Sequence, residues 1–130
     1  MEEETFIDEY FKNPDNVAAD VWCENRKVKP AEFYQMGETS QADCFVIMKK
    51  ITCKDGFKMS VQACYSHYCN PRITIRSTHT NYYDTYEVGY PSEKEELLMP
   101  YAEDKEDPTQ TVYGQVPKDI INKIIEKHNH

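Results

Sequence analysis

Glycine is scarce in this sequence, with four residues in 130. Phosphate-binding loops and the sharp turns that present nucleophiles depend on glycine, because it adopts backbone conformations that other residues avoid. The sequence contains no glycine-rich phosphate loop, no dinucleotide-binding fingerprint, no serine nucleophile turn and no His-Glu-x-x-His motif. These absences weigh against an enzyme, and we expect neither catalytic residues nor a cofactor.

Long apolar runs are also missing. No stretch approaches the roughly 20 apolar residues that cross a bilayer. The sequence begins with Met1 and three glutamates, whereas a secretory signal begins with basic residues and continues with apolar ones. The five cysteines are odd in number and irregularly spaced, which favours buried free thiols in a reducing compartment. We therefore expect a cytoplasmic protein with no membrane partner.

The charges that are present are segregated along the chain. Residues 1–24 and residues 84–107 each carry a net charge of −7, whereas residues 25–83 carry +5. Two acidic segments on one small protein favour binding to a basic surface. The overall charge of −8, together with the absence of a nucleic-acid-binding motif, weighs against direct binding of DNA or RNA.

Apolar periodicity predicts an α+β fold with N-terminal helices in a single domain over residues 1–130. Phe6, Ile7, Tyr10 and Phe11 share one face at helical spacing, which predicts the first helix. The sequence Asn13-Pro14-Asp15 is typical of a helix start and predicts a second helix that continues to about Glu24 with Val17, Val21 and Trp22 inward. A short helical turn is expected at residues 30–36.

The clearest pattern predicts a hairpin over residues 43–67. Apolar and polar residues alternate from Phe57 onward, and a three-residue loop with Gly56 in the left-handed conformation keeps the apolar residues of both strands on one face. This register places Met59 opposite Ile51 and Tyr65 opposite Phe45. Further strands are expected at 72–77, 82–90 and 110–116, and helices at 92–99 and 117–128. The predicted architecture is an antiparallel sheet of about four strands built on the 43–67 hairpin and covered by a C-terminal helix.

The acidic segment 84–107 supplies the candidate binding residues. It lacks the alternating ligands and central glycine of a calcium loop, so its simplest interpretation is a solvated acidic loop. The more specific hypothesis is that its carboxylates take the place of phosphates on a nucleic-acid-binding protein, with tyrosines as anchors. The candidate partner-binding residues are Glu93, Glu95, Glu96, Glu103, Asp104, Glu106, Asp107, Tyr86, Tyr90 and Tyr101.

Cys64, His67 and Cys69 are the residues of metal-ligand type that lie closest together in the sequence. Cys53, Cys23 or His79 would complete a shell of four ligands. Structural zinc sites usually contain two well-spaced pairs, and positions 64 and 67 of one continuous strand point to opposite faces. We therefore expect a buried cysteine beside a histidine at a strand end, with no metal. A metal-binding or small enzyme domain centred on these three residues is the alternative function.

Three stretches in the C-terminal half resemble a known class of proteins. They are Glu87-Val-Gly-Tyr-Pro-Ser, Leu97-Leu-Met-Pro-Tyr-Ala-Glu, and Thr111-Val-Tyr-Gly-Gln-Val-Pro followed by an isoleucine-rich helix. In these residues the chain resembles small accessory proteins of phages and mobile elements in Gram-positive bacteria. The resemblance covers about a third of the chain. It implies a setting in the host cell cytosol and an inhibitor of a host defence nuclease, such as a CRISPR nuclease. A phage structural or scaffold protein is a further alternative.

Overall fold

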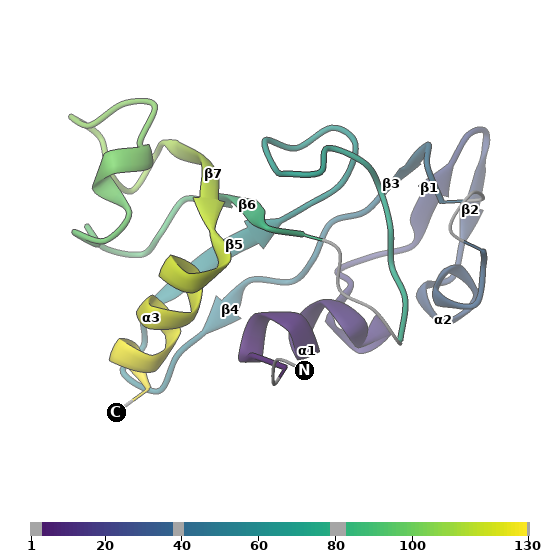
Figure 1. The fold of residues 1–130 in the computed structure, drawn as a ribbon, viewed down its shortest axis with the longest axis horizontal. Helices are drawn as coiled ribbons and strands as arrows, with labels where there is room; N and C mark the ends of the chain where they lie inside the picture. Colours follow the sequence, from purple (N-terminus) through teal and green to yellow (C-terminus); the bar gives the residue numbers. More distant parts are fainter. Residues whose placement is uncertain (1–3, 38–40, 79–82, 130) are drawn as a thin grey trace.

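The computed structural model describes residues 4–37, 41–78 and 83–129, which form two antiparallel sheets and the helices around them (Figure 1). The α-helices are α1 (Phe6–Lys12), α2 (Pro30–Tyr34) and α3 (Lys118–His128), and the 3-10 turns are η1 (Pro14–Asn16) and η3 (Met99–Tyr101). The strands are β1 (Val21–Cys23), β2 (Arg26–Val28), β3 (Cys44–Phe45), β4 (Ile51–Thr52), β5 (Lys58–Gln62), β6 (Thr85–Gly89) and β7 (Val112–Pro117). The predicted α+β class, the antiparallel pairing and the C-terminal helix are confirmed.

The larger sheet has the strand order β4-β5-β6-β7. Its first two strands form the predicted hairpin, with Met59 opposite Ile51. Gly56 has a φ angle of +94°, and its amide donates to the carbonyl of Cys53 to close the turn. Only glycine adopts this conformation readily, so the predicted position of the glycine fixed the register correctly.

The far end of the predicted hairpin is wrong. Phe45 does not pair with Tyr65; strand β3 pairs instead with β1, and Phe45 lies opposite Trp22 in a smaller sheet of order β2-β1-β3. The side chain of Gln62 ends the pairing between β5 and the preceding chain. Its amide group accepts from the backbone of Met48 at 2.8 Å and donates back to it at 2.9 Å.

The predicted second helix at 13–24 is also wrong after its first turn. Asn13 does accept a hydrogen bond from the amide of Asp15, but η1 ends at Asn16 and the chain becomes extended. Val21 then pairs with Val28 in the smaller sheet, and Trp22 is 48% exposed instead of buried. The β-branched valines suit a strand as well as a helical stripe, and the cross-strand partners decide between the two.

Two shorter predicted elements are absent as well. Residues 72–77 form no strand, because the backbone amide of Arg76 donates to the side chain of Gln41 instead of to a neighbouring strand. The helix predicted at 92–99 does not form, and a 3-10 turn begins only at Met99. Ser92 bonds to the backbone of Lys58 through both its amide and its hydroxyl, and so continues the pairing with β5 beyond the end of β6.

The hydrophobic core contains residues from both sheets in one cluster. Helix α3, predicted at 117–128, contributes an isoleucine stripe, of which Ile121, Ile124 and Ile125 are buried. Helix α1 adds Ile7 and Phe11, and the ring of Phe11 packs against Tyr86 at 4.9 Å between centroids. None of the helices among the described residues has the length and apolar character that crossing a membrane requires.

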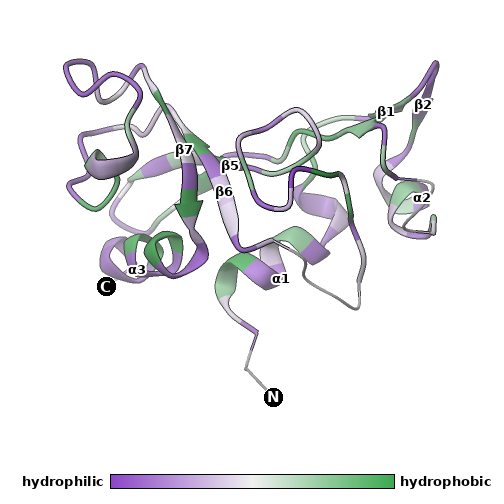
Figure 2. Cartoon of the chain, turned by 45° about the horizontal axis from the view of Figure 1, so that its top comes forward, coloured by the Kyte–Doolittle hydropathy of each residue, from purple (hydrophilic) through white to green (hydrophobic). Residues whose placement is uncertain are grey.

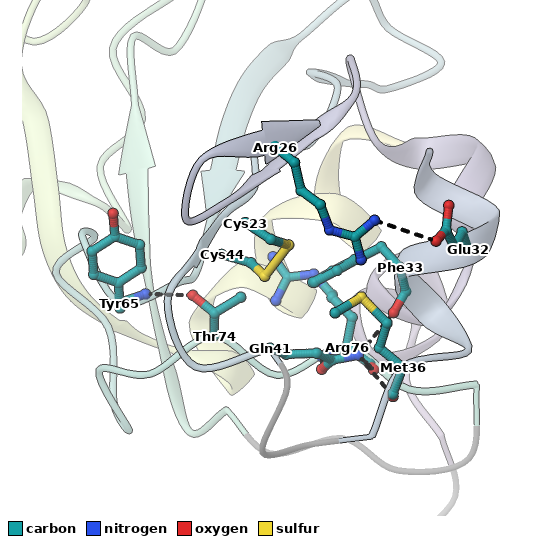
Figure 3. The surroundings of a disulfide bond; sticks show 10 residues. All are labelled: Cys23, Arg26, Glu32, Phe33, Met36, Gln41, Cys44, Tyr65, Thr74 and Arg76. Atoms are coloured by element: carbon teal, nitrogen blue, oxygen red, sulfur yellow. Dashed lines mark hydrogen bonds and ion pairs between the residues drawn. A yellow bond between two sulfur atoms is a disulfide. The ribbon is translucent and has the colours of Figure 1, made fainter. Parts of the chain in front are cut away.

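The cysteines differ in part from the prediction of free thiols. Cys23 of β1 and Cys44 of β3 are directly opposite one another and form a disulfide (Figure 3). The pair was not expected because the odd number and irregular spacing of the cysteines favoured free thiols in a reducing compartment. Cys53, Cys64 and Cys69 are free and buried, as predicted. The disulfide removes one of the two observations on which the cytoplasmic prediction rested, so that location stays a proposal.

Candidate functional site: an acidic loop and an adjoining hollow

The chain between β6 and β7, residues 90–111, is here called the acidic loop. Most of the candidate carboxylates are exposed in it, and Figure 2 shows the loop as largely hydrophilic. The basic residues of the acidic loop are Lys94 and Lys105, and Lys94 forms an exposed ion pair with Glu96 at 3.3 Å. The exposed acidic residues are Glu93, Glu96, Glu103, Asp104, Glu106 and Asp107.

Glu95 has a different place from its neighbours. Its side chain is 1% exposed and accepts hydrogen bonds from Lys127 at 2.9 Å and from the amide of Leu97 at 2.9 Å. The ring of His128 lies between Glu95, at 2.8 Å, and Asp55 of the hairpin turn. We call these four side chains, Glu95, Lys127, His128 and Asp55, the clasp. Because it is buried in the clasp, Glu95 is not part of the exposed acidic surface.

The clasp shifts the pKa values of His128, Glu95 and Asp55 so that the charged form of each is favoured. Burial alone lowers the pKa of His128, but its hydrogen bonds to Asp55 and Glu95 outweigh burial and raise it. Burial alone raises the pKa of Glu95, but its bonds to Lys127, Leu97 and His128 lower it. The amide of Phe57 and the ring of His128 lower the pKa of Asp55. All three groups are therefore charged together between the ordinary pKa of Glu95, 4.5, and that of His128, 6.5.

The second half of the acidic loop is fixed to β7 by hydrogen bonds. The amide of Glu103 donates to the carbonyl of Val112 at 3.1 Å, and the amide of Asp104 donates to the hydroxyl of Thr111 at 3.0 Å. The hydroxyl of Tyr113 donates to the carbonyl of Pro108. These bonds and the clasp therefore fix the backbone of the loop, which carries the exposed carboxylates, at both ends.

The three predicted anchor tyrosines are not equivalent. Tyr86 is fully buried in the core and cannot contact a partner in this structure. Tyr101 is half-buried at the end of η3. Tyr90 is 50% exposed and has a φ angle of +49°, which is uncommon for a residue other than glycine. Tyr90 is thus the anchor candidate that the structure leaves accessible.

A hollow of about 190 Å³ lies beside the acidic loop. Its floor consists of alternate residues of adjacent strands, whose intervening residues Val61 and Val88 are buried in the core. The lining residues are Ile47, Ser60, Gln62, His67, Glu87, Gly89, Tyr90 and Val112. The polar alternation of 58–62 was visible in the sequence, but no local pattern predicts that Ile47 and Tyr90 enclose it.

Cys64 and His67 meet at the edge of this hollow. Strand β5 ends at Gln62, the chain turns, and the Sγ of Cys64 lies 2.9 Å from Nδ1 of His67. Burial by itself raises the pKa of a thiol, but hydrogen bonds from His67, Ser66 and the backbone outweigh burial and lower the pKa of Cys64 to about 6. Cys64 is fully buried and His67 is 8% exposed, so the histidine is the member of the pair that lines the hollow.

The third residue of the predicted cluster does not join this pair as a ligand. The thiol of Cys69 donates to the carbonyls of Cys64 and Pro71, and its pKa is raised by burial to about 11. Cys23 is in the disulfide, and His79 lies outside the described residues. Within the described parts of the chain, no group of three histidine, cysteine or acidic side chains is placed to hold a metal ion.

The two acidic segments of the sequence lie at different ends of α3. Asp8 of α1 is buried and forms an ion pair with Lys118 in the first turn of α3, at 3.3 Å. Glu95 contacts Lys127 in the last turn, about 14 Å further along the helix axis. The candidate binding surface therefore consists of the acidic loop without the N-terminal acidic segment.

The comparisons with known proteins add no relative. No protein-family model, no curated protein and no solved structure matches this chain.

Proposed function

We propose that this protein is a binding module whose acidic loop occupies a basic, nucleic-acid-binding surface of another protein. The observation that carries the proposal is the clasp, because it buries one carboxylate of the loop and so holds the six others on a fixed frame. A loop backbone that is already ordered loses little conformational entropy on binding, and the field of its carboxylates favours encounter with a cationic surface.

The narrower form of the proposal is an inhibitor of a host defence nuclease encoded by a phage or mobile element. It is supported by the resemblance of the C-terminal stretches and by the charge of −8. A nuclease that binds nucleic acid through lysine and arginine side chains has a positively charged surface, to which the negative charge of the loop is complementary. On this proposal the protein acts in the cytosol of the host cell.

The proposal is tested by reversing charges in two places. In the loop variant, Glu93, Glu96, Glu106 and Asp107 are changed to Lys. In the matched control, the exposed residues Asp15, Glu24, Glu32 and Asp43 are changed to Lys, which alters the net charge equally. Glu95 is left intact in both, because its substitution would disturb the clasp. Tagged wild-type, loop and control proteins are used to capture binding proteins from a bacterial lysate at low and high salt.

We expect a nucleic-acid-binding protein to be retained by the wild type and the control, to be released by salt, and to be lost from the loop variant. Added nucleic acid should compete with the wild-type protein for the retained partner. Equal retention by the loop variant and the control would show that the loop is not the binding surface. A partner that nucleic acid does not displace would contradict the occupation of a nucleic-acid site.

A further inference from the structure

The hollow beside the acidic loop presents hydrogen-bond acceptors. One carboxylate oxygen of Glu87, Oε2, accepts from the amide of Tyr68 at 2.7 Å, and Oε1 is not engaged by any described residue. The hydrogen bond from the backbone fixes the carboxylate against the floor of the hollow. Glu87 therefore offers a positioned negative charge with one oxygen available to a ligand.

His67 offers a second acceptor because of its contact with Cys64. The two ring nitrogens differ, since Nδ1 is held by the Sγ of Cys64 and Nε2 has no hydrogen-bond partner among the described residues. A thiolate at Cys64 accepts a hydrogen bond, so it retains the proton on Nδ1. In the neutral ring, Nε2 then carries a lone pair. The buried cysteine thus acts on the hollow by setting the tautomer of the histidine.

The walls of the hollow suit a flat cation on an apolar stem. Tyr90 contributes an exposed aromatic ring, and Ile47, which is 38% exposed, and Val112 contribute apolar surface. A planar guanidinium stacks on aromatic rings and donates several hydrogen bonds in one plane, whereas an ammonium is a compact and strongly hydrated charge. Arginine therefore fits the combination of acceptors, ring and apolar wall better than lysine.

The hollow is continuous with the acidic loop. The amide of Tyr90 donates to the carbonyl of Thr111 at 3.3 Å, and the carbonyl of Val112 accepts from Glu103. A partner that lies on the loop carboxylates can therefore insert a side chain into the hollow without leaving the loop.

We propose that the hollow binds the guanidinium group of an arginine side chain of the protein partner, with Glu87 and His67 as hydrogen-bond acceptors and Tyr90 stacked on the cation. This proposal rests on the proposed function, because it names the side chain that anchors the partner. The carboxylates of the loop attract arginine and lysine side chains equally, whereas the hollow binds arginine in preference to lysine.

The test compares fluorescein-labelled nona-arginine and nona-lysine peptides, whose binding is followed by fluorescence anisotropy at physiological ionic strength. We expect the wild-type protein to bind nona-arginine about tenfold more tightly than nona-lysine. Glu87→Gln and Tyr90→Ala should abolish this preference. The loop variant described above should bind both peptides more weakly and should still prefer nona-arginine.

Two further variants separate binding in the hollow from general effects. Gly89→Val adds apolar volume to the hollow without a change of charge, and its Cβ lies 3.8 Å from Val112, an ordinary van der Waals distance. It should also remove the preference. Glu32→Gln removes an exposed carboxylate elsewhere and should leave the preference unchanged. Nitrogen-15 NMR of the His67 ring should show the proton on Nδ1 in the wild type and a changed tautomer balance in Cys64→Ala.

The outcomes distinguish this inference from the proposed function. An equal affinity of the wild type for the two peptides, or a preference that persists in Glu87→Gln, Tyr90→Ala and Gly89→Val, overturns the arginine site while the proposed function stands. If the loop variant binds both peptides as tightly as the matched control does, the proposed function fails. A preference that is lost only in the hollow variants, together with weaker binding of both peptides by the loop variant, supports both.

Discussion

The four-stranded sheet and the three-stranded sheet are stabilised by different means. The four-stranded sheet packs against α3, a helix of 11 residues with an apolar stripe, and its strands β5 to β7 contain five or six residues each. The three-stranded sheet has strands of two or three residues and the five-residue helix α2 beside it. Its outer face carries Trp22 and Phe45, both exposed, with the ammonium of Lys27 over the Trp22 ring.

The difference shows what a thin sheet needs in place of a large core. Strands of two or three residues provide few hydrogen bonds and little buried area, so they are marginal by themselves. The smaller sheet has a disulfide between its strands β1 and β3, and the buried Gln41 side chain joins the carbonyl of Phe33 to the backbone of Arg76 (Figure 3). The larger sheet is expected to depend on apolar packing, and the smaller one on these specific links.

The largest effect is expected from a truncation under the four-stranded sheet. Ile124 is fully buried, and Ile124→Ala should reduce the free energy of unfolding by about 4 kcal/mol because it leaves a cavity that α3 cannot close. Urea unfolding measures the loss. Ile73→Ala is the matched control, because Ile73 is 41% exposed and its truncation should cost less than about 1 kcal/mol. Equal losses would contradict the role given to the α3 stripe.

Removal of the disulfide should affect the smaller sheet selectively. The bond joins residues 21 apart, and constraining a loop of that size stabilises a protein by about 3 kcal/mol. In the double variant Cys23→Ala with Cys44→Ala, or after reduction, the amides of β1, β2 and β3 should exchange with solvent faster. Those of β5, β6 and β7 should keep most of their protection. Uniform loss of protection across both sheets would show that the two regions are not distinct.

The clasp gives a smaller effect that depends on pH. Glu95→Gln preserves the size of the side chain but removes the charge that Lys127 and His128 share, and it should cost about 2 kcal/mol. The acidic loop should then become more sensitive to proteolysis. Glu96→Gln is the control, because Glu96 is exposed and only Lys94 pairs with it.

The pH dependence of the clasp follows from the directions of its pKa values. His128 has a raised pKa, so its contribution is complete below its ordinary value of 6.5 and is lost as the pH rises through the raised value. Glu95 has a lowered pKa, so its contribution is complete above its ordinary value of 4.5 and is lost as the pH falls through the lowered value. The difference in stability between wild type and Glu95→Gln should therefore be greatest between about pH 4.5 and 6.5. A difference that does not vary with pH would contradict a charged clasp.

The same contrast explains how much of the molecule could be predicted from the sequence. The hairpin turn at Gly56, strands β6 and β7 and helix α3 follow local rules of turn chemistry and periodicity, and all four were predicted correctly. The smaller sheet was missed because its strands are too short for periodicity, and the pairing of Cys23 with Cys44 depends on residues 21 positions apart. Glu95 and Glu96 are adjacent and chemically alike. Glu95 is buried because it contacts Lys127 of α3, which lies 32 residues further along the chain. Glu96 does not make this contact and stays exposed.

The smallest effect is expected at the junction of the two sheets, where Cys64 contacts His67 and the His67 ring lies 5.7 Å from that of Phe45. The pKa of Cys64 is lowered from 9.0 to about 6, so the thiolate should stabilise the folded protein increasingly as the pH rises from about 6 to 9. At pH 7 the contribution should be about 1 kcal/mol, and it should vanish below pH 5. Urea unfolding of Cys64→Ala at pH 5 and pH 7 should show this change against the wild type. Cys69→Ala is the control, because a thiol whose pKa is about 11 does not titrate in that range. If the stability of the two variants responds equally to pH, Cys64 is not a thiolate. The argument that Cys64 keeps the proton of His67 on Nδ1 then fails as well.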